Sequence, residues 1–376
     1  MKNKTIILRM TNTCNLDCKY CYDKYNHVST NQENIDFESK IPNIINNIQK
    51  IWQNRDEKSE LIFHGGEPLI INTTNYRLLI DGLKKIYPYM RFSIQTNATL
   101  INQEYIDLFK DYGIHVGISL DGYDVNTNKY RVYKNGRNSF GDVIDKIRLL
   151  KKNNMRFGII MTINNNIVNN ELELYNFIKK YNVNCNIRPA FKCSNLELDY
   201  ISEEEYYAFF TNLFNIWIND KNADVKFNQI KEIQDEFIKN LNSNYNCNVC
   251  SGSGHCFNNF ISLDRNGNVY SCNRTYNNQE FFYGNLEEIS MDDIEEKIEK
   301  INKSRRSYIE NSKCKSCILY TECHGGCPAT AFSLHGCIES ADDSFCNARK
   351  KIRMYVNEYL EKNNIKKEYL EKVKNE

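Results

Sequence analysis

The sequence predicts an α/β fold, a partial barrel of six strand–helix units, and two observations lead to this prediction. From residue 5 to about residue 190, short apolar runs alternate with segments whose apolar residues recur at helical spacing. Such alternation favours a parallel sheet with helices on its outside. Six units are too few for a closed eight-unit barrel, so we expect a partial barrel with its chemistry at the C-terminal strand ends.

The expected strands are short and separated by helical patterns. They are Thr5–Arg9, Leu61–Phe63, Arg91–Gln95, His115–Ser119, Phe157–Thr162 and Cys185–Arg188. Between the second and third strands, Tyr76, Leu79, Ile80 and Leu83 have the spacing of one helix face. Pro42 suits the first turn of an earlier helix, where its missing N–H costs nothing.

The remaining sequence predicts three further regions after the barrel, which we place at residues 1–195. They are a helical bridge at 196–246, a cysteine-rich domain at 247–350 and a C-terminal helix at 351–376. The bridge holds two amphipathic patterns, around Tyr206–Trp217 and Ile230–Leu241. The cysteine-rich domain begins with a hairpin signal, ISLDRNGNVYS, which has Asn266-Gly267 at its turn.

Composition narrows the function classes. The 376 residues carry 49 basic and 48 acidic side chains, a net charge of +1, which gives no support for a nucleic-acid or membrane partner held by bulk electrostatics. No apolar run approaches the length of a membrane span, and the N-terminus does not resemble a signal peptide. We therefore expect a cytoplasmic protein, whose reducing setting favours cysteines as thiolate metal ligands rather than as disulfides. Of its 15 cysteines, Cys185 and Cys193 lack partners at ligand spacing, and we expect them to be packed thiols.

Three cysteines lie in the eight residues CNLDCKYC, directly after the first expected strand. They are Cys14, Cys18 and Cys21. Closed zinc and iron–sulfur sites take four protein ligands, whereas a catalytic metal centre keeps a position open. Three thiolates on a four-iron cluster leave one iron without a protein ligand. This motif closely resembles that of the radical SAM enzymes.

The resemblance implies a cofactor and a reaction. In that family S-adenosylmethionine (SAM) binds the open iron, and the reduced [4Fe-4S] cluster splits it into methionine and a 5′-deoxyadenosyl radical that abstracts hydrogen from the substrate. Tyr20 would place an aromatic ring against the cluster. The cofactor supplies the difficult chemistry, while the protein binds, orients and excludes side reactions. Oxygen-labile clusters imply an anaerobic setting, and a flavodoxin or ferredoxin would supply electrons.

Motifs after the later strands fit the same family. Gly65, Gly66 and Glu67, followed by proline, match its GGEP motif, in which glycines let the backbone approach the SAM ammonium and Glu67 can accept its hydrogens. Ser119 and Arg131 match positions that bind the ribose and the carboxylate in related maturases, and an arginine fork suits a carboxylate. Each motif alone is weak; their occurrence after successive strands of one barrel is what carries the prediction.

The C-terminal cysteines resemble the SPASM extension of radical SAM enzymes that modify peptides, which carries two auxiliary [4Fe-4S] clusters. By this match, one cluster takes Cys250, Cys256, Cys272 and Cys327, and the other takes Cys314, Cys317, Cys323 and Cys346. Cys247 is an alternative to Cys250. Cys337 is an alternative to Cys346, because the gap before Cys346 is one residue longer than usual. Paired zinc sites are the competing interpretation, since CxxC pairs are zinc-like.

The resemblance is strongest to anaerobic sulfatase-maturating enzymes, which oxidise a Cys or Ser to formylglycine. In those maturases an aspartate, the proposed proton acceptor, follows the third ligand of the first auxiliary cluster, and here Asn273 stands at that position. A neutral amide cannot accept a proton at physiological pH, so the catalytic base is unassigned.

On this ground the sequence favours a radical SAM/SPASM oxidoreductase that crosslinks or otherwise modifies a ribosomally made peptide (RiPP maturation). The alternative is a formylglycine-forming sulfatase maturase. A third interpretation, from another class, is a multi-cluster electron carrier without SAM chemistry, and it would need neither an open iron nor a GGEP loop.

Overall fold

The computed structural model describes five stretches of the chain, residues 5–23, 30–53, 59–190, 200–220 and 256–363. By their internal contacts they fall into two compact units. The first unit comprises residues 1–120, 128–158 and 255–308, and the second comprises residues 121–127, 159–254 and 309–376.

The first unit is built on a sheet with the strand order β4-β3-β2-β1-β7-β8-β9. Strands β1 to β4 pair in parallel, β7 joins β1 in parallel, and β8 and β9 continue as an antiparallel meander. The strands are β1 (Thr5–Thr11), β2 (Glu60–Gly65), β3 (Arg91–Thr96), β4 (His115–Ser119), β7 (Phe260–Asp264), β8 (Asn268–Tyr270) and β9 (Phe282–Asn285).

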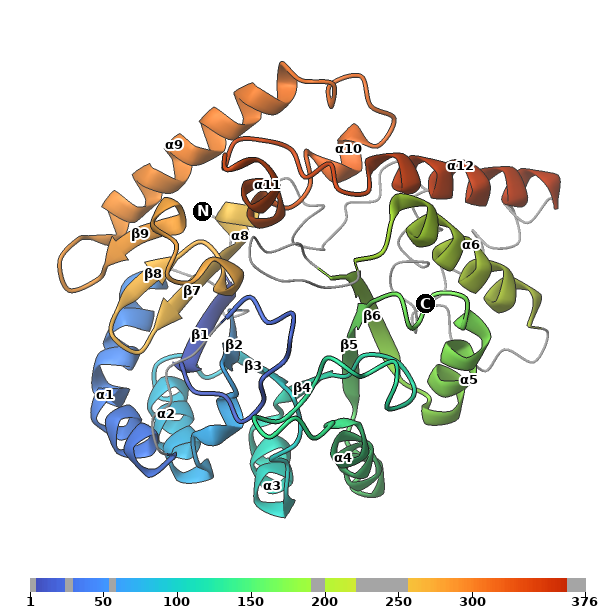
Figure 1. The fold of residues 1–376 in the computed structure, drawn as a ribbon. Helices are drawn as coiled ribbons and strands as arrows, with labels where there is room; N and C mark the ends of the chain where they lie inside the picture. Colours follow the sequence, from blue (N-terminus) through green and yellow to red (C-terminus); the bar gives the residue numbers. More distant parts are fainter. Residues whose placement is uncertain (1–4, 24–29, 54–58, 191–199, 221–255, 364–376) are drawn as a thin grey trace. The chain divides into compact units, whose positions relative to one another are not determined.

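Helices α1, α2 and α3 lie along the outer side of strands β1 to β4 (Figure 1). Alternate residues of β2 and β3 are buried, among them Leu61, Phe63 and Ile94, while the residues between them are only half-buried or exposed. This is the alternation that a sheet shows when one face packs against helices. The helices of the unit are α1 (Thr30–Ile51), α2 (Thr73–Lys84), α3 (Gln103–Tyr112), α4 (Phe140–Lys152), α8 (Cys256–Asn259) and α9 (Met291–Glu310), with short 3₁₀ turns at Pro68–Ile70, Asn273–Thr275 and Gln279–Phe281.

The second unit holds the last two barrel strands and most of the C-terminal cysteines. Helix α6 packs against α5 and α12, with the ring centroids of Phe214 and Tyr359 5.3 Å apart and those of Tyr206 and Phe345 4.6 Å apart. Its elements are β5 (Phe157–Ile163, which begins in the first unit), α5 (Glu171–Tyr181), β6 (Asn184–Pro189), α6 (Glu203–Asn219), α10 (Tyr320–Cys323), α11 (Pro328–His335) and α12 (Cys346–Lys362).

Most predicted elements are confirmed. All six barrel strands form within two residues of their expected bounds, and the hairpin turns at Gly267, whose φ of +85° suits glycine. The bridge helix around Tyr206–Trp217 is α6, whereas the pattern at Ile230–Leu241 lies outside the described residues. The C-terminal helix begins at Cys346, and the division into four domains stays a prediction.

The start predicted for the first helix is wrong. Pro42 was expected in the first turn, but α1 already begins at Thr30 and Pro42 lies in its interior on the exposed side. An interior proline removes one backbone hydrogen bond. Helix α1 offsets this cost by burying Phe37, Ile44 and Ile48. None of the described helices is both long and apolar enough to cross a membrane.

Candidate active site

The loop that carries the cysteine triplet leaves β1 and is held by the segment around Arg131. The Asp17 N–H donates to the Val132 carbonyl (2.7 Å) and the Lys19 N–H to the Tyr130 carbonyl (3.0 Å). These bonds bring the Arg131 guanidinium to 4.0 Å from the Cys18 sulfur and to 5.4 Å from the centre of the Tyr20 ring. The structure thus brings Arg131 to Cys18 and Tyr20, two other predicted site residues that precede it by more than a hundred positions.

The three thiols lie close enough to influence one another. Burial raises the pKa of Cys14, and the charges of Glu67, Cys18 and Cys21 raise it further. Burial likewise raises the pKa of Cys21 to about 11, against the nearby Arg131 and Arg9 charges that lower it. Thiols with raised pKa values are protonated, and a protonated thiol is a poor ligand. A coordinating cation deprotonates such thiols and stabilises the thiolates.

The donor set fits an open iron–sulfur cluster. Across the part of the chain that the structure describes, no three His, Cys, Asp or Glu side chains gather around a single metal ion. A four-iron cluster needs a different arrangement, because each of its thiolate ligands binds a different iron. Cys14, Cys18 and Cys21 lie on one loop near the Arg131 and Arg9 charges, and they could supply thiolates for three irons.

The GGEP loop packs against the backbone just before Cys14. The Gly66 N–H donates to the Thr11 carbonyl and the Glu67 N–H to the Thr13 carbonyl, both at 2.9 Å. A Cβ on Gly66 would lie 2.2 Å from the Thr13 oxygen, and Gly65 has a φ of +123°. Both glycines are therefore required by local geometry, which places the loop beside the cluster ligands.

The Glu67 carboxylate anchors this loop through buried hydrogen bonds. It is fully buried and accepts hydrogen bonds from the Thr96 hydroxyl (2.5 Å), the Asn97 N–H (2.8 Å) and the Leu69 N–H (3.0 Å). Burial raises the pKa of Glu67 to about 7, although these donors lower it. Its contacts fix the loop on the end of β3, and the predicted contact with the SAM ammonium stays a prediction.

Two residues of the QTN segment join the site. Asn97 donates from Nδ2 to the Asn15 side chain at 2.9 Å and lies 3.9 Å from the Cys14 sulfur. Gln95 donates to the hydroxyl of Ser119, the last residue of β4, at 2.9 Å. These residues, part of the segment 95–97 at the end of β3, had no role among the residues predicted from the sequence, because only the fold reveals their partners.

A buried polar network joins β1 to Asn273. The Arg9 guanidinium pairs with Asp23 (2.6 Å), donates to the Asn273 side-chain oxygen (3.0 Å) and stacks over the Tyr276 ring at 3.9 Å. The Asn273 amide nitrogen in turn lies 3.0 Å from the Tyr22 hydroxyl and 3.1 Å from the His64 ring. Asn273 is thus held on both sides as a neutral hydrogen-bonding group beside the GGEP loop.

His64 contributes to this network as a neutral ring. Burial and the Arg9 charge lower the pKa of His64 to about 4, and its Nδ1 accepts from the Gly65 N–H at 2.8 Å. Because Nδ1 is an acceptor there, the proton of the neutral ring lies on Nε2.

The lowered pKa of His64 predicts a pH effect on stability. The unfolded chain binds a proton near pH 6.5 and the folded chain only near pH 4, so the unfolded state holds more protons between these values. This contribution to the free energy of unfolding is present above pH 6.5 and is lost as the pH falls towards 4, by up to about 1.4 kcal/mol per pH unit. We expect His64→Gln to flatten that slope in urea unfolding measured from pH 7 to pH 5. The variant His115→Gln, at an exposed position, is the reference, and equal slopes in the two variants would contradict the prediction.

The predicted auxiliary ligands divide between the two units. Cys256 and Cys272 belong to the first, and both thiols raise the pKa of the buried Tyr283, after burial itself. Cys250 and its alternative Cys247 lie outside the described residues, and Cys327 belongs to the second unit. The grouping of these four cysteines on one cluster stays a prediction.

The second predicted ligand set lies within one unit. Burial and the charges of Cys323 and Cys314 raise the pKa of Cys346 to about 11, so the three thiols are neighbours. Cys317 is one turn from Cys314, since its N–H donates to the Cys314 carbonyl at 3.0 Å. The alternative ligand Cys337 instead donates to the Glu339 carboxylate at 3.2 Å. The proximity of Cys346 to Cys323 and Cys314 favours it over Cys337, and the choice between the two ligands stays a prediction.

This chain resembles known proteins in sequence. Residues 8–178 match the family model described as the radical SAM superfamily. The chain is 29% identical over 338 residues to a cysteine-type anaerobic sulfatase-maturating enzyme of Clostridium novyi, covering 87% of this chain and 88% of the relative. It is 26% identical over 378 residues to a serine-type anaerobic sulfatase-maturating enzyme of Bacteroides thetaiotaomicron, covering 93% and 88%.

Solved structures share the fold along the whole length. The structure of native anSMEcpe with bound AdoMet and Cp18Cys peptide superposes with a TM-score of 0.79 and 21% identity, covering 98% of this chain and 100% of that one. Streptococcus suis SuiB bound to precursor peptide SuiA gives a TM-score of 0.64 at 15% identity, covering 92% and 76%. Residues 8–178 therefore match the radical SAM superfamily in sequence, and the chain shares its fold with these two solved proteins.

Proposed function

We propose that the protein is an anaerobic maturase that oxidises a Cys or Ser side chain of a peptide or protein substrate to formylglycine. The observation that carries the proposal is similarity to both cysteine-type and serine-type sulfatase-maturating enzymes over 87% and 93% of the chain. The fold shared with a peptide-bound enzyme supports a peptide substrate. The comparisons thus favour the formylglycine alternative over the crosslinking reaction that the sequence preferred.

The cofactors of the proposal are SAM and three [4Fe-4S] clusters, and together they supply a 5′-deoxyadenosyl radical and a path for the second electron of a two-electron oxidation. The chain's own residues would bind and orient these groups. Cys14, Cys18 and Cys21 would hold three irons, and Arg131, which lies beside Cys18, would bind the SAM carboxylate. The electron donor in the proposal is a flavodoxin or ferredoxin, and the setting is an anaerobic cytosol.

A second candidate function is retained because of Asn273. Its amide is buried and bound by Arg9, so the position where the maturases carry an aspartate offers no carboxylate here. Crosslinking of a ribosomally made peptide is the radical SAM/SPASM reaction that we keep as this second candidate. The multi-cluster electron carrier finds no support, since the chain has a radical SAM domain.

The two enzyme functions differ in product. Reconstituted protein is incubated anaerobically with SAM, reductant and two sulfatase-type peptides that differ only in Cys or Ser at the target position, and the products are analysed by mass spectrometry. We expect an aldehyde from at least one peptide, together with 5′-deoxyadenosine. Release of 5′-deoxyadenosine with both peptides unchanged would contradict formylglycine formation and favour a dedicated peptide substrate for crosslinking.

A further inference from the structure

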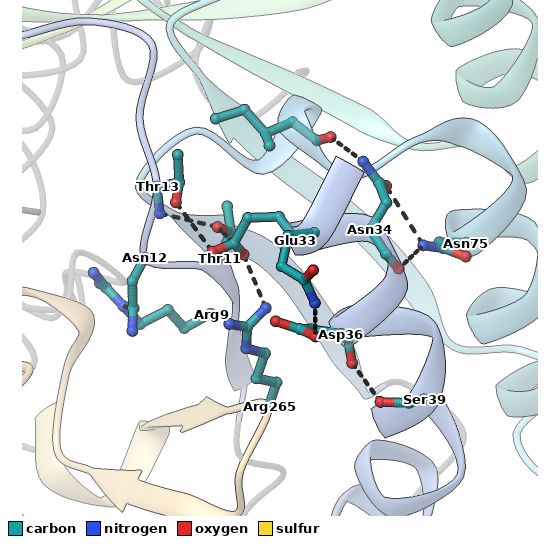
Figure 2. Close-up of polar contacts among 12 residues, drawn as sticks. Arg9, Thr11, Asn12, Thr13, Glu33, Asn34, Asp36, Ser39, Asn75 and Arg265 are labelled. Carbon is teal, nitrogen blue, oxygen red and sulfur yellow. Dashed lines mark hydrogen bonds and ion pairs between the residues drawn. The ribbon is translucent and has the colours of Figure 1, made fainter. Parts of the chain in front are cut away.

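Glu33, in the first turns of α1, is a buried carboxylate with an unusual set of partners. Its side chain is 1% exposed. It accepts hydrogen bonds from the hydroxyls of Thr11 (2.7 Å) and Thr13 (3.1 Å), and it pairs with the Arg265 guanidinium at 2.8 Å. Figure 2 shows Glu33 directed from its helix at the end of β1, with Arg265 approaching from the hairpin. A charge buried to this degree is stable only because it is paired and hydrogen-bonded.

The GGEP loop is hydrogen-bonded to these two threonines. Their backbone carbonyls accept the N–H groups of Gly66 and Glu67 at 2.9 Å. Thr13 also directly precedes Cys14, the first ligand of the triplet. The Thr13 N–H donates to the Thr11 hydroxyl at 2.9 Å, so the short turn between them is closed by the same hydroxyl that Glu33 binds. Glu33 therefore contacts two threonines whose backbone is hydrogen-bonded to the GGEP loop, and one of them directly precedes the first cluster ligand.

Arg265 brings a third segment to this point. It lies in the turn between β7 and β8, and β8 leads directly towards Cys272. Strand β7 pairs with β1 in register up to Arg9 and Asp264, so the hairpin is fixed beside β1 with Arg265 just beyond the last pair. The Asp264 carboxylate accepts from the Asn266 and Asn268 N–H groups and shapes the turn from which Arg265 extends. Glu33 is therefore bound by both the SAM site and the hairpin of the cysteine-rich region.

Resting on the function proposed above, we propose that Glu33 is a positioning residue that holds the Cys14 turn and the GGEP loop in the geometry that binds SAM, with Arg265 as its charge partner. Neither side chain touches the reacting atoms in this proposal. Groups that orient the ligands of a metal site commonly lower metal affinity or activity by 10- to 100-fold when they are removed. A partner that served only to stabilise the fold would lower stability without changing the SAM-bound cluster.

The test compares Glu33→Gln with Glu38→Gln, an exposed glutamate on the same helix. Both proteins are reconstituted anaerobically, their iron content is measured, and SAM is titrated while the electron paramagnetic resonance spectrum of the reduced cluster is recorded. We expect Glu33→Gln to keep its iron but to bind SAM about tenfold more weakly, with a changed spectrum of the SAM-bound cluster. Glu38→Gln should match the wild type in both readouts. Unchanged SAM affinity and spectrum in Glu33→Gln would overturn the proposal.

If the Glu33→Gln protein does not take up its clusters, a second variant tests the proposal. Thr13→Val removes one hydroxyl that binds Glu33 and keeps the carboxylate paired with Arg265. Weaker SAM binding in Thr13→Val with full iron content supports the proposal, and wild-type affinity overturns it. The wild-type titration separates the two levels of inference: a wild type that binds no SAM contradicts the proposed function, whereas normal SAM binding in all variants contradicts only the role of Glu33.

Discussion

Replacing Arg9 with methionine is expected to lower the free energy of unfolding by about 3–5 kcal/mol, the usual cost of breaking a buried ion pair by removing one partner. The Arg9 side chain is 1% exposed and pairs with Asp23, which is 9% exposed. Its loss leaves the Asp23 carboxylate buried without its cation and removes the donor to the Asn273 oxygen. A methionine fills similar volume, so the loss comes mainly from the uncompensated charge rather than from a cavity.

Two further variants isolate that cause. The double variant Arg9→Met/Asp23→Asn removes the stranded charge and should recover a large part of the stability. Arg148→Met breaks an exposed pair with Asp145 and should cost less than about 1 kcal/mol. Urea unfolding of the anaerobically reconstituted proteins measures all three. An Arg9→Met protein as stable as Arg148→Met would show that the buried network contributes little to the fold.

The second large effect is expected from Gly66→Ala, which should weaken SAM binding by about a hundredfold, the size of loss that a misplacement of about 1 Å can cause in the rate at a preorganised site. The added Cβ would lie 2.2 Å from the Thr13 oxygen and 2.7 Å from its carbonyl carbon. Both atoms belong to the backbone before Cys14 and cannot rotate away. The GGEP loop must therefore move away from the cluster ligands or push their loop aside.

The matched control is Gly141→Ala in the first turn of α4, where a Cβ meets nothing within 4 Å. We expect this variant to bind SAM like the wild type and to be slightly more stable, since alanine is the better helix former. SAM affinity is measured by equilibrium titration of the reconstituted proteins. Wild-type affinity in Gly66→Ala would mean that the GGEP backbone does not need its close approach to residue 13.

Much of the candidate site could be predicted from local sequence. The alternation of apolar runs predicts parallel strands, and parallel strands carry their C-terminal loops to one edge of the sheet. This reasoning correctly placed the cysteine triplet, the GGEP loop and Ser119 at the ends of β1, β2 and β4. The turn at Asn266-Gly267 could also be predicted from local sequence, because the turn residues themselves favour a two-strand hairpin.

Other features were misread because helix boundaries are weakly encoded. The expected start of the first helix lay near Pro42, whereas Thr30 and Glu33 have the spacing of a helix start, T-x-x-E. That signal could have extended the helix to include Glu33. It could not have revealed that the Glu33 carboxylate accepts bonds from Thr11 and Thr13, since these contacts depend on how α1 packs beside β1.

The sequence by itself determined the class of this protein: a thiolate triplet with an open position, a glycine-rich loop after the next strand and a cysteine-rich C-terminal region. These are patterns of spacing, which a chain carries whatever its fold. The tertiary structure alone decided that Arg9 binds Asn273, 264 positions away, and that Arg265 neutralises Glu33. The physical reason is that partners of buried charges are chosen by strand register and helix packing, which bring together residues with no relation in sequence.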